Sequence, residues 1–152
     1  KGEEIEEEFE TKIRLAVEAF LPDKYIADSS QKVSIYRRIA QITSDEENAD
    51  LMKELEDRFG KLPVQVRRLF AISEIKRIAQ SLRIKEISSI GDEVSFSFDT
   101  DRPIINTEKL IAMVKTNKKL RLSPPSQMMI NIEGMGQDQQ LLTIKNTLHQ
   151  LI

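Results

Sequence analysis

The sequence contains no cysteine, which excludes a disulfide framework and any metal site built from thiolates. Histidine is almost as scarce, because His149 is the only one and has no second histidine or cysteine with which to bind zinc. We interpret it as an exposed residue of the last predicted helix, not as part of a Ser–His–Asp triad. Tryptophan is also absent and aromatic residues make up 5% of the chain, so no stacking surface for nucleic-acid bases is visible.

The two common nucleotide-binding loops are missing too. The five glycines form neither Gly-x-x-x-x-Gly-Lys-Ser/Thr nor Gly-x-Gly-x-x-Gly. Gly134 and Gly136 fit a turn before the last helix better than they fit a nucleotide fingerprint. We therefore predict that this chain is not an enzyme by itself and that it binds no cofactor and no metal.

Long apolar runs are a further absence. No stretch approaches the ~18 apolar residues of a membrane-spanning helix, and nothing in the sequence resembles a signal peptide. Together with the lack of cysteine, this predicts a cytoplasmic protein with no membrane partner.

Charge is balanced overall but segregated along the chain. The 23 basic and 25 acidic residues give a net charge of -2, which offers no global argument for binding nucleic acid. Residues 3–10 and 45–57 are mostly acidic, whereas residues 67–85 and 109–121 are mostly basic. Such blocks are usually solvated helix faces, and the alternative is docking to a partner of complementary charge.

The chain is long enough to bury a sizeable core as one domain. We interpret residues 1–10 as a charged linker from a preceding domain and residues 11–152 as a single domain.

The central pattern of the domain is a helix, a short loop and a second helix. Gly60 lies where the end of a helix favours a positive φ, and Pro63 lies where the next helix can begin. Apolar residues at helical spacing on both sides predict helices over residues 45–59 and 62–82.

Two further elements are predicted before this pair. Residues 11–21 alternate apolar and polar side chains, which is typical of a half-buried strand. Ser29-Ser30 can cap a helix that runs to Ile42, and residues 44–47 have the pattern of a capping box for the helix that follows. The inner face of the first helix is expected to consist of Val33, Ile35 or Tyr36, Ile39 and Ala40.

The C-terminal part reads as two β-hairpin-like units, each followed by a helix. Residues 84–90 and 93–98 are β-prone runs joined around Gly91-Asp92. Asn106 or Thr107 can cap a helix that runs to Thr116, with Leu110, Ile111 and Val114 inward. Strands at 120–122 and 128–132 follow. The last helix covers 139–151, and its apolar residues are Leu141, Leu142, Ile144, Leu148 and Leu151. The order is a strand, three helices, then ββαββα. This order predicts an α+β fold in which the late strands form a small, mostly antiparallel sheet.

One long and ordered stretch resembles a known family. Val-Ser-Ile-Tyr-Arg-Arg-Ile-Ala-Gln-Ile at 33–42 is followed by an acidic helix and then by Glu-Leu-Glu-Asp-Arg-Phe-Gly-Lys-Leu-Pro at 54–63. A basic helix and a short β segment come next. This pattern is similar to the C-terminal domain of bacterial transcription-repair coupling factors, closely over residues 13–90 and loosely beyond them.

The resemblance implies a function for the whole parent protein. That protein would be an ATP-driven DNA translocase that removes stalled RNA polymerase at lesions and recruits UvrA for nucleotide excision repair. ATP and duplex DNA would bind its motor, outside this chain.

The resemblance also implies a regulatory, non-catalytic role for this domain. In the family, the domain docks on a UvrB-like N-terminal module of the same protein and masks the surface that binds UvrA. Glu54 and Arg58 match positions in the docking surface, and Asp57 is a weaker addition. These residues lie off the centre of the apolar stripe, so we expect them to face solvent. The alternative for each is that it only braces its own helix.

A nucleic-acid-binding module is the competing hypothesis. Six basic residues lie on or just after the second helix of the pair and could contact phosphates: Arg67, Arg68, Lys76, Arg77, Arg83 and Lys85. The acidic helix beside them would oppose such contacts or neutralise them.

Overall fold

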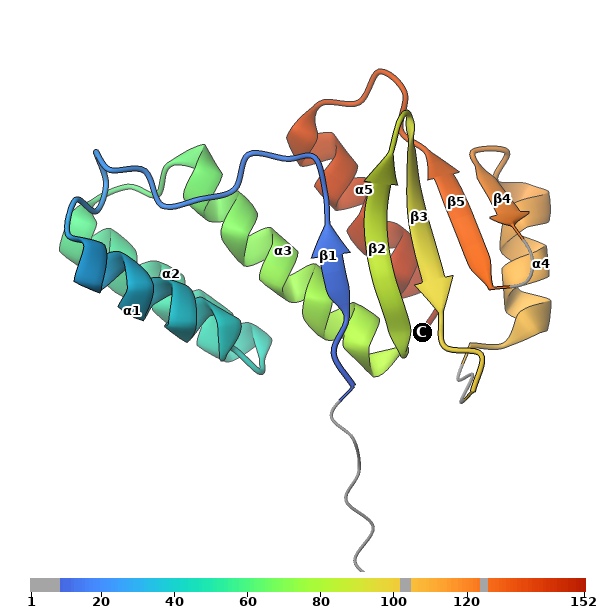
Figure 1. Ribbon diagram of the computed structural model, residues 1–152, viewed down its shortest axis with the longest axis horizontal. Coiled ribbons are helices and arrows are strands. Elements are labelled where there is room, and N and C mark those ends of the chain that lie inside the picture. The colour runs from blue at the N-terminus through green and yellow to red at the C-terminus, as the bar shows by residue number, and fades with distance from the viewer. Residues whose placement is uncertain (1–8, 102–104, 124–125) are drawn as a thin grey trace, which may run out of the picture.

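The computed structural model describes residues 9–101, 105–123 and 126–152 (Figure 1). The first eight residues of the predicted linker lie outside the described residues. The elements follow the predicted order, a strand, three helices and ββαββα, and the predicted α+β class is confirmed.

Three helices form the first part of the molecule: α1 (Ser29–Ala40), α2 (Asp45–Phe59) and α3 (Val64–Ser81). Ile35 and Ile39 of α1 and Leu51 and Leu55 of α2 are buried against one another and against the start of α3. The helical spacing of these apolar residues explains why one face of each helix is turned inward.

A five-stranded sheet forms the second part. Its strands are β1 (Lys12–Arg14), β2 (Ile84–Ile90), β3 (Glu93–Phe98), β4 (Leu120–Ser123) and β5 (Gln127–Asn131). The spatial order is β1-β2-β3-β5-β4. The β2–β3 hairpin turns at Gly91-Asp92 as predicted, and only β1 pairs in parallel, so the sheet is mixed and mostly antiparallel.

Two more helices cover one face of this sheet, as Figure 1 shows: α4 (Thr107–Thr116) and α5 (Gln137–Gln150). Ile144 and Leu148 of α5 pack with Val94 and Phe96 of β3 in a second hydrophobic cluster. These four side chains are fully buried.

Helix α3 belongs to both hydrophobic clusters and joins the two parts. Its Val66 and Phe70 pack with α1 and α2, whereas its Ile75 and Ala79 pack with the sheet and α5. An 18-residue helix is about 27 Å long. One continuous helix therefore fixes the position of the α1–α2 pair relative to the sheet.

The helix starts differ in detail from the sequence prediction. Asp28, not Ser29 or Ser30, caps α1, since its carboxylate accepts a hydrogen bond from the Gln31 amide at 3.1 Å. Ser44 caps α2 as predicted and accepts from the Glu47 amide at 3.1 Å.

The predicted loop between α2 and α3 is confirmed. Gly60 follows α2 with φ of 93°. Pro63 is the N-cap of α3, so this helix begins at Val64, two residues later than predicted.

The predicted strand over residues 11–21 is wrong in its length. Only Lys12 to Arg14 pair with β2. Beyond this ladder, the Ala16 amide donates to the Ser89 hydroxyl at 3.1 Å. The alternation of burial nevertheless continues to Leu21, which is buried. The alternating pattern over residues 11–21 therefore indicates an extended chain, only part of which pairs with the sheet.

Several inner-face assignments are also wrong. Val33 and Ala40 of α1 and Ile111 of α4 are exposed. Of the two alternatives Ile35 and Tyr36, Ile35 is the buried one. Met113 replaces Ile111 as the buried residue of α4. In each helix the apolar residues span more than one face, and packing selects which of them is covered.

Candidate protein-docking surface

The predicted site residues lie in the second half of α2. Glu54 is half-buried, with 38% of its side chain exposed, and Arg58 is exposed at 44%. Asp57 is exposed as well. Leu51 and Leu55 are turned into the core on the opposite side of the same turns. The apolar period of α2 therefore directs these charges to the surface, as predicted.

Glu54 lies between two guanidinium groups. Arg38 of α1 binds it with both terminal nitrogens, Nη2 to Oε1 at 2.8 Å and Nη1 to Oε2. Arg58 adds a contact from Nη1 to Oε2 at 3.2 Å, one turn further along α2. The structure thus brings together Glu54, Arg58 and one residue that the sequence analysis did not assign, Arg38.

This arrangement keeps Glu54 ionised. Hydrogen bonds from Arg38, with smaller contributions from its charge and from Arg58, lower the Glu54 pKa from 4.5 to about 2. The same pair raises the pKa of Arg38. A bidentate Arg–carboxylate pair is the strong and directional form of a salt bridge. The surface therefore presents a charged carboxylate in a defined orientation at neutral pH.

The end of α2 is held by aromatic side chains under the charged surface. The Arg58 guanidinium lies 4.9 Å from the centroid of the Phe59 ring, and Tyr25 packs against Phe59 at 5.7 Å. The Tyr25 hydroxyl donates towards the Leu55 and Gly60 carbonyls, at 3.1 and 2.8 Å. These contacts order the last turn of α2 and with it the position of Arg58.

Asp57 stands apart from this set. Its carboxylate makes no hydrogen bond or ion pair with any of the described residues. Its assignment to the docking surface stays a prediction.

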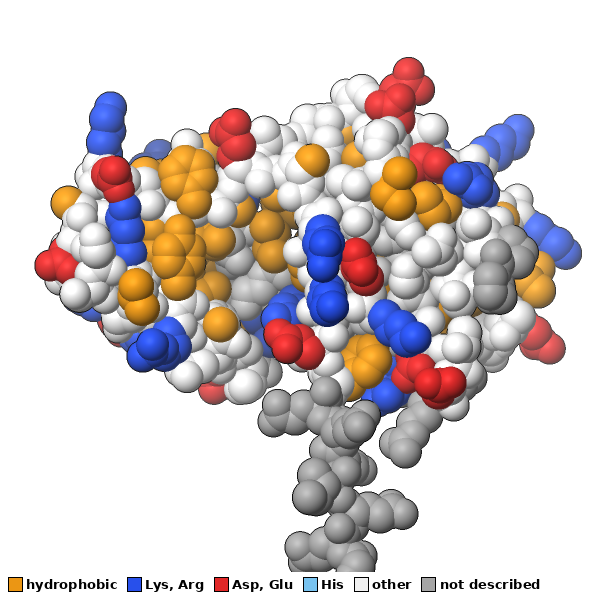
Figure 2. All heavy atoms as spheres, viewed as in Figure 1, with side chains coloured by type: hydrophobic (Ala, Val, Ile, Leu, Met, Phe, Trp, Pro, Cys, Tyr) orange, Lys and Arg blue, Asp and Glu red, His pale blue; other side chains and the backbone are white. Residues whose placement is uncertain are grey.

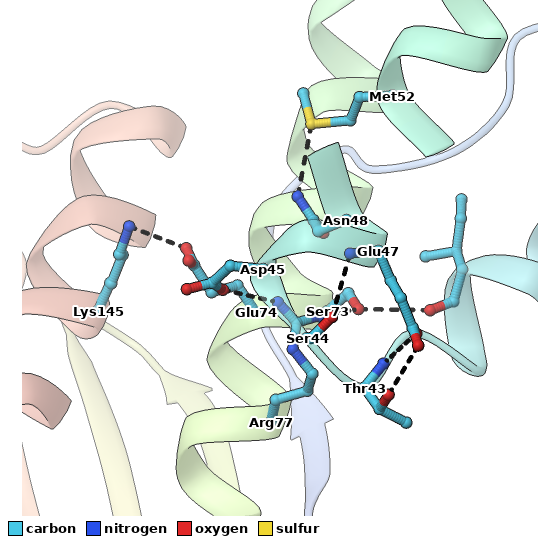
Figure 3. Close-up of polar contacts among 11 residues, drawn as sticks. Thr43, Ser44, Asp45, Glu47, Asn48, Met52, Ser73, Glu74, Arg77 and Lys145 are labelled. Carbon is cyan, nitrogen blue, oxygen red and sulfur yellow. Dashed lines mark hydrogen bonds and ion pairs between the residues drawn. The ribbon is translucent and has the colours of Figure 1, made fainter. Parts of the chain in front are cut away.

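The other end of α2 is fixed against α3, as Figure 3 shows. Asp45 of α2 pairs with Arg77 of α3 at 3.3 Å. The Ser73 hydroxyl of α3 donates to the Ile39 carbonyl of α1 at 3.4 Å, so α1 is held against the same helix. Nearby, Lys145 of α5 pairs with Glu74 of α3 at 2.9 Å. The helix that carries the candidate surface is therefore tied to the rest of the fold at both ends.

The basic helix of the competing hypothesis is largely neutralised within the chain. Four of its six basic residues bind carboxylates: Arg68 with Asp138 (2.8 Å), Lys76 with Glu10 (2.9 Å), Arg77 with Asp45 (3.3 Å) and Arg83 with Asp99 (2.8 Å). Only Arg67 and Lys85 have no ion pair within the part of the chain that the structure describes. On the face drawn in Figure 2, basic and acidic side chains are interspersed.

Other kinds of site find little support in the described residues. Across residues 9–101, 105–123 and 126–152, no group of three or more His, Cys, Asp or Glu side chains is placed to hold a metal ion. In the same ranges no helix combines the length and the apolar character that crossing a membrane requires. The candidate site is therefore the charged set formed by Arg38 of α1 with Glu54 and Arg58 of α2.

Comparisons with known proteins give the family. The model of the TRCF domain matches residues 15–110. The chain is 31% identical to transcription-repair-coupling factor of Bacillus subtilis, over 95% of this chain and 13% of that protein. The Haemophilus influenzae protein of the same name is 34% identical over 68% of this chain and 9% of its own length. The chain thus spans about an eighth of the length of the Bacillus subtilis protein.

A solved structure supports the fold independently. It is described as a crystal structure of the C-terminal domain of transcription-repair coupling factor, and it superimposes with a TM-score of 0.79 at 20% identity, covering 93% of both chains. At that identity the likeness shows the fold alone. The family match covers both stretches that carried the sequence resemblance, at 33–42 and 54–63. The chain belongs to the TRCF domain family, as a C-terminal domain of transcription-repair coupling factor.

Proposed function

We propose that this chain is a regulatory domain that docks on a UvrB-like N-terminal module of its parent protein and masks the surface that binds UvrA. The observation that carries the proposal is the set formed by Arg38 of α1 with Glu54 and Arg58 of α2. It combines an ionised carboxylate with two guanidinium groups and is partly exposed, and α2 is held at both ends. Such a preordered polar surface is what a specific and reversible contact between domains requires.

The activity of the parent protein is part of the same proposal. The parent would use ATP in a separate motor to move along DNA, remove stalled RNA polymerase at lesions and recruit excision repair through UvrA. This chain would contribute no catalytic residue and no cofactor. Its role would be to hold the parent in a restrained state until docking is released.

The structure determines how docking should be tested. Reversing Glu54 to Arg would place a third guanidinium beside Arg38 and Arg58, and the like charges would destabilise the α1–α2 contact. Neutral variants avoid this effect. The test variant is therefore Glu54→Gln with Arg58→Gln, which removes one charge of each sign and introduces no like charge beside Arg38.

A matched control uses Glu108→Gln with Lys115→Gln on α4. Both residues are exposed, the change in charge is the same, and α4 lies at the opposite end of the molecule from α2 (Figure 1). Titration calorimetry with the purified UvrB-like module measures docking of each variant, and thermal melting checks that each remains folded.

We expect the α2 variant to lose affinity at least about tenfold, since it removes charged contacts worth about 1.4 kcal/mol or more. The control should dock like the original chain. In the full-length protein the α2 variant should bind more UvrA, because docking and masking are coupled through one equilibrium. Unchanged docking by a folded α2 variant would show that these residues only brace the helix.

A further inference from the structure

The stretch at 33–42 has no assigned role, although it is half of the sequence pattern that identifies the family. The structure shows that its two arginines differ. Arg37 is exposed and has no ion pair with a described residue, whereas Arg38 crosses from α1 to Glu54 on α2. Ile39, the next residue, is buried and fixes the rotation of α1 about its axis. The two halves of the pattern therefore meet in space through one side chain, Arg38.

We propose that Arg38 is a positioning residue for docking: it holds the Glu54 carboxylate in the orientation that the partner recognises and leaves one acceptor position open. This inference rests on the proposed docking role of Glu54. Arg38 would act through Glu54, so its contribution should vanish when Glu54 can no longer bind it as a carboxylate.

The number of acceptor positions supports this division of roles. A carboxylate offers about four lone-pair positions. Arg38 occupies one on each oxygen, and Arg58 occupies a second on Oε2. The remaining position is on Oε1, and the Glu54 side chain is 38% exposed. A partner donor can therefore bind Glu54 without displacing either arginine.

Arg58 alone would not hold the Glu54 side chain in one orientation. Its contact with Glu54 is single, lies within one helix and is partly exposed, and such pairs constrain a side chain weakly. The fork of Arg38 contacts both carboxylate oxygens from a second helix. Losing it would free the rotamers of Glu54, and ordering them again at the moment of docking would reduce affinity.

A double-mutant cycle in the 152-residue chain tests the inference. Arg38→Gln, Glu54→Gln and the combined variant are titrated with the purified UvrB-like module, and each is checked by thermal melting. We expect Arg38→Gln to weaken docking up to about fivefold in the original background, the range of a partly exposed ion pair. In the Glu54→Gln background, the same change should have no effect on docking.

A second readout separates positioning from a general loss of structure. Carbon-13 NMR should find the Glu54 carboxyl pKa near 2 in the original chain and closer to the ordinary value in Arg38→Gln. Docking by Arg38→Gln should then fall between pH 5 and pH 4, roughly where an ordinary Glu protonates. Arg38→Lys keeps the charge but lacks the fork, so it should restore part of the affinity.

The outcomes distinguish this inference from the proposed function. If Glu54→Gln weakens docking and Arg38→Gln does not, or if Arg38→Gln is equally harmful in both backgrounds, the positioning role is wrong and docking stands. If Glu54→Gln docks normally, both the site assignment and the role of Arg38 fail. If Arg38→Gln unfolds the chain, Arg38→Lys replaces it in the double-mutant cycle with Glu54→Gln.

Discussion

Gly60 adopts a backbone conformation that other residues rarely reach. Its φ of 93° and ψ of -174° lie in a region that is essentially limited to glycine. A Cβ added there would meet no atom within 4 Å, so the constraint comes from the backbone and not from crowding. The same residue ends α2 directly after Phe59, so its conformation determines where α2 stops.

We predict that Gly60→Val lowers stability by about 1–3 kcal/mol, the usual cost of a strained backbone conformation. Urea unfolding of the two proteins measures this as a lower midpoint with an unchanged slope. Gly136→Ser is the control, because Gly136 caps α5 with an ordinary φ of -69° and also has open space around it. Equal midpoints for Gly60→Val and the original chain would show that the loop can adopt another backbone conformation without loss of stability.

Glu54 should make stability depend on pH in an acidic window. Its pKa is lowered from 4.5 to about 2 on folding, so its ion pairs stabilise the fold fully above pH 4.5 and lose their effect as the pH falls towards 2. The contribution should stay below about 1 kcal/mol because the pair is partly exposed.

Melting temperatures of the original chain and Glu54→Gln, compared from pH 7 to pH 2, test this dependence. The difference between them should be constant down to pH 4.5 and should disappear near pH 2. A difference that does not change with pH would mean that Arg38 does not hold Glu54 in solution.

The start of α2 shows how a helix end is fixed by neighbouring side chains. Ser44 accepts from the Glu47 amide, and the Glu47 carboxylate accepts from the Thr43 amide at 2.8 Å and the Thr43 hydroxyl at 3.0 Å. A standard capping box would direct Glu47 to the Ser44 amide instead. Here the box includes the residue before the cap and so also orders the α1–α2 loop.

Ser44→Ala should destabilise the chain by about 1 kcal/mol, since it removes the acceptor for a helix-end amide. Ser34→Ala is the matched control, because Ser34 is exposed within α1 and alanine favours a helix interior. In thermal melting, Ser44→Ala should therefore unfold at a lower temperature than the original chain, and Ser34→Ala at a slightly higher one. If they melt alike, the Ser44 hydrogen bond contributes nothing to the stability of the fold.

At the scale of the whole molecule, contacts between the two parts decide what the basic helix can bind. Arg68 pairs with Asp138 of α5, and Arg77 pairs with Asp45 of α2. Both guanidinium groups are more buried than their carboxylate partners. Phosphates would have to compete with these carboxylates, which lie between the guanidinium groups and the solvent.

We predict that the isolated chain binds duplex DNA only weakly and without sequence preference. Any binding should come from phosphate contacts, so it should fall steeply as salt is raised. Fluorescence anisotropy with a labelled duplex at physiological salt measures this. Submicromolar affinity for one sequence over another would favour the nucleic-acid module over docking.

The sequence by itself determined the local structure of this protein. The helical spacing around Leu51 and Leu55 and the glycine at position 60 predicted α2 and its end, and the β-prone runs around Gly91 predicted the hairpin. These features depend on residues a few positions apart, so local geometry and solvent exclusion are enough to fix them. For the same reason the exposure of Glu54 could be foreseen.

Only the tertiary structure decided which charged side chains that are distant in sequence form ion pairs. Arg38 lies 16 residues from Glu54, and Arg68 lies 70 residues from Asp138. The parallel pairing of β1 with β2 brings Ile13 beside Ile87. No local pattern encodes such pairs, because their distances depend on how the helices and the sheet pack. Packing therefore added Arg38 to the candidate surface and neutralised much of the basic helix.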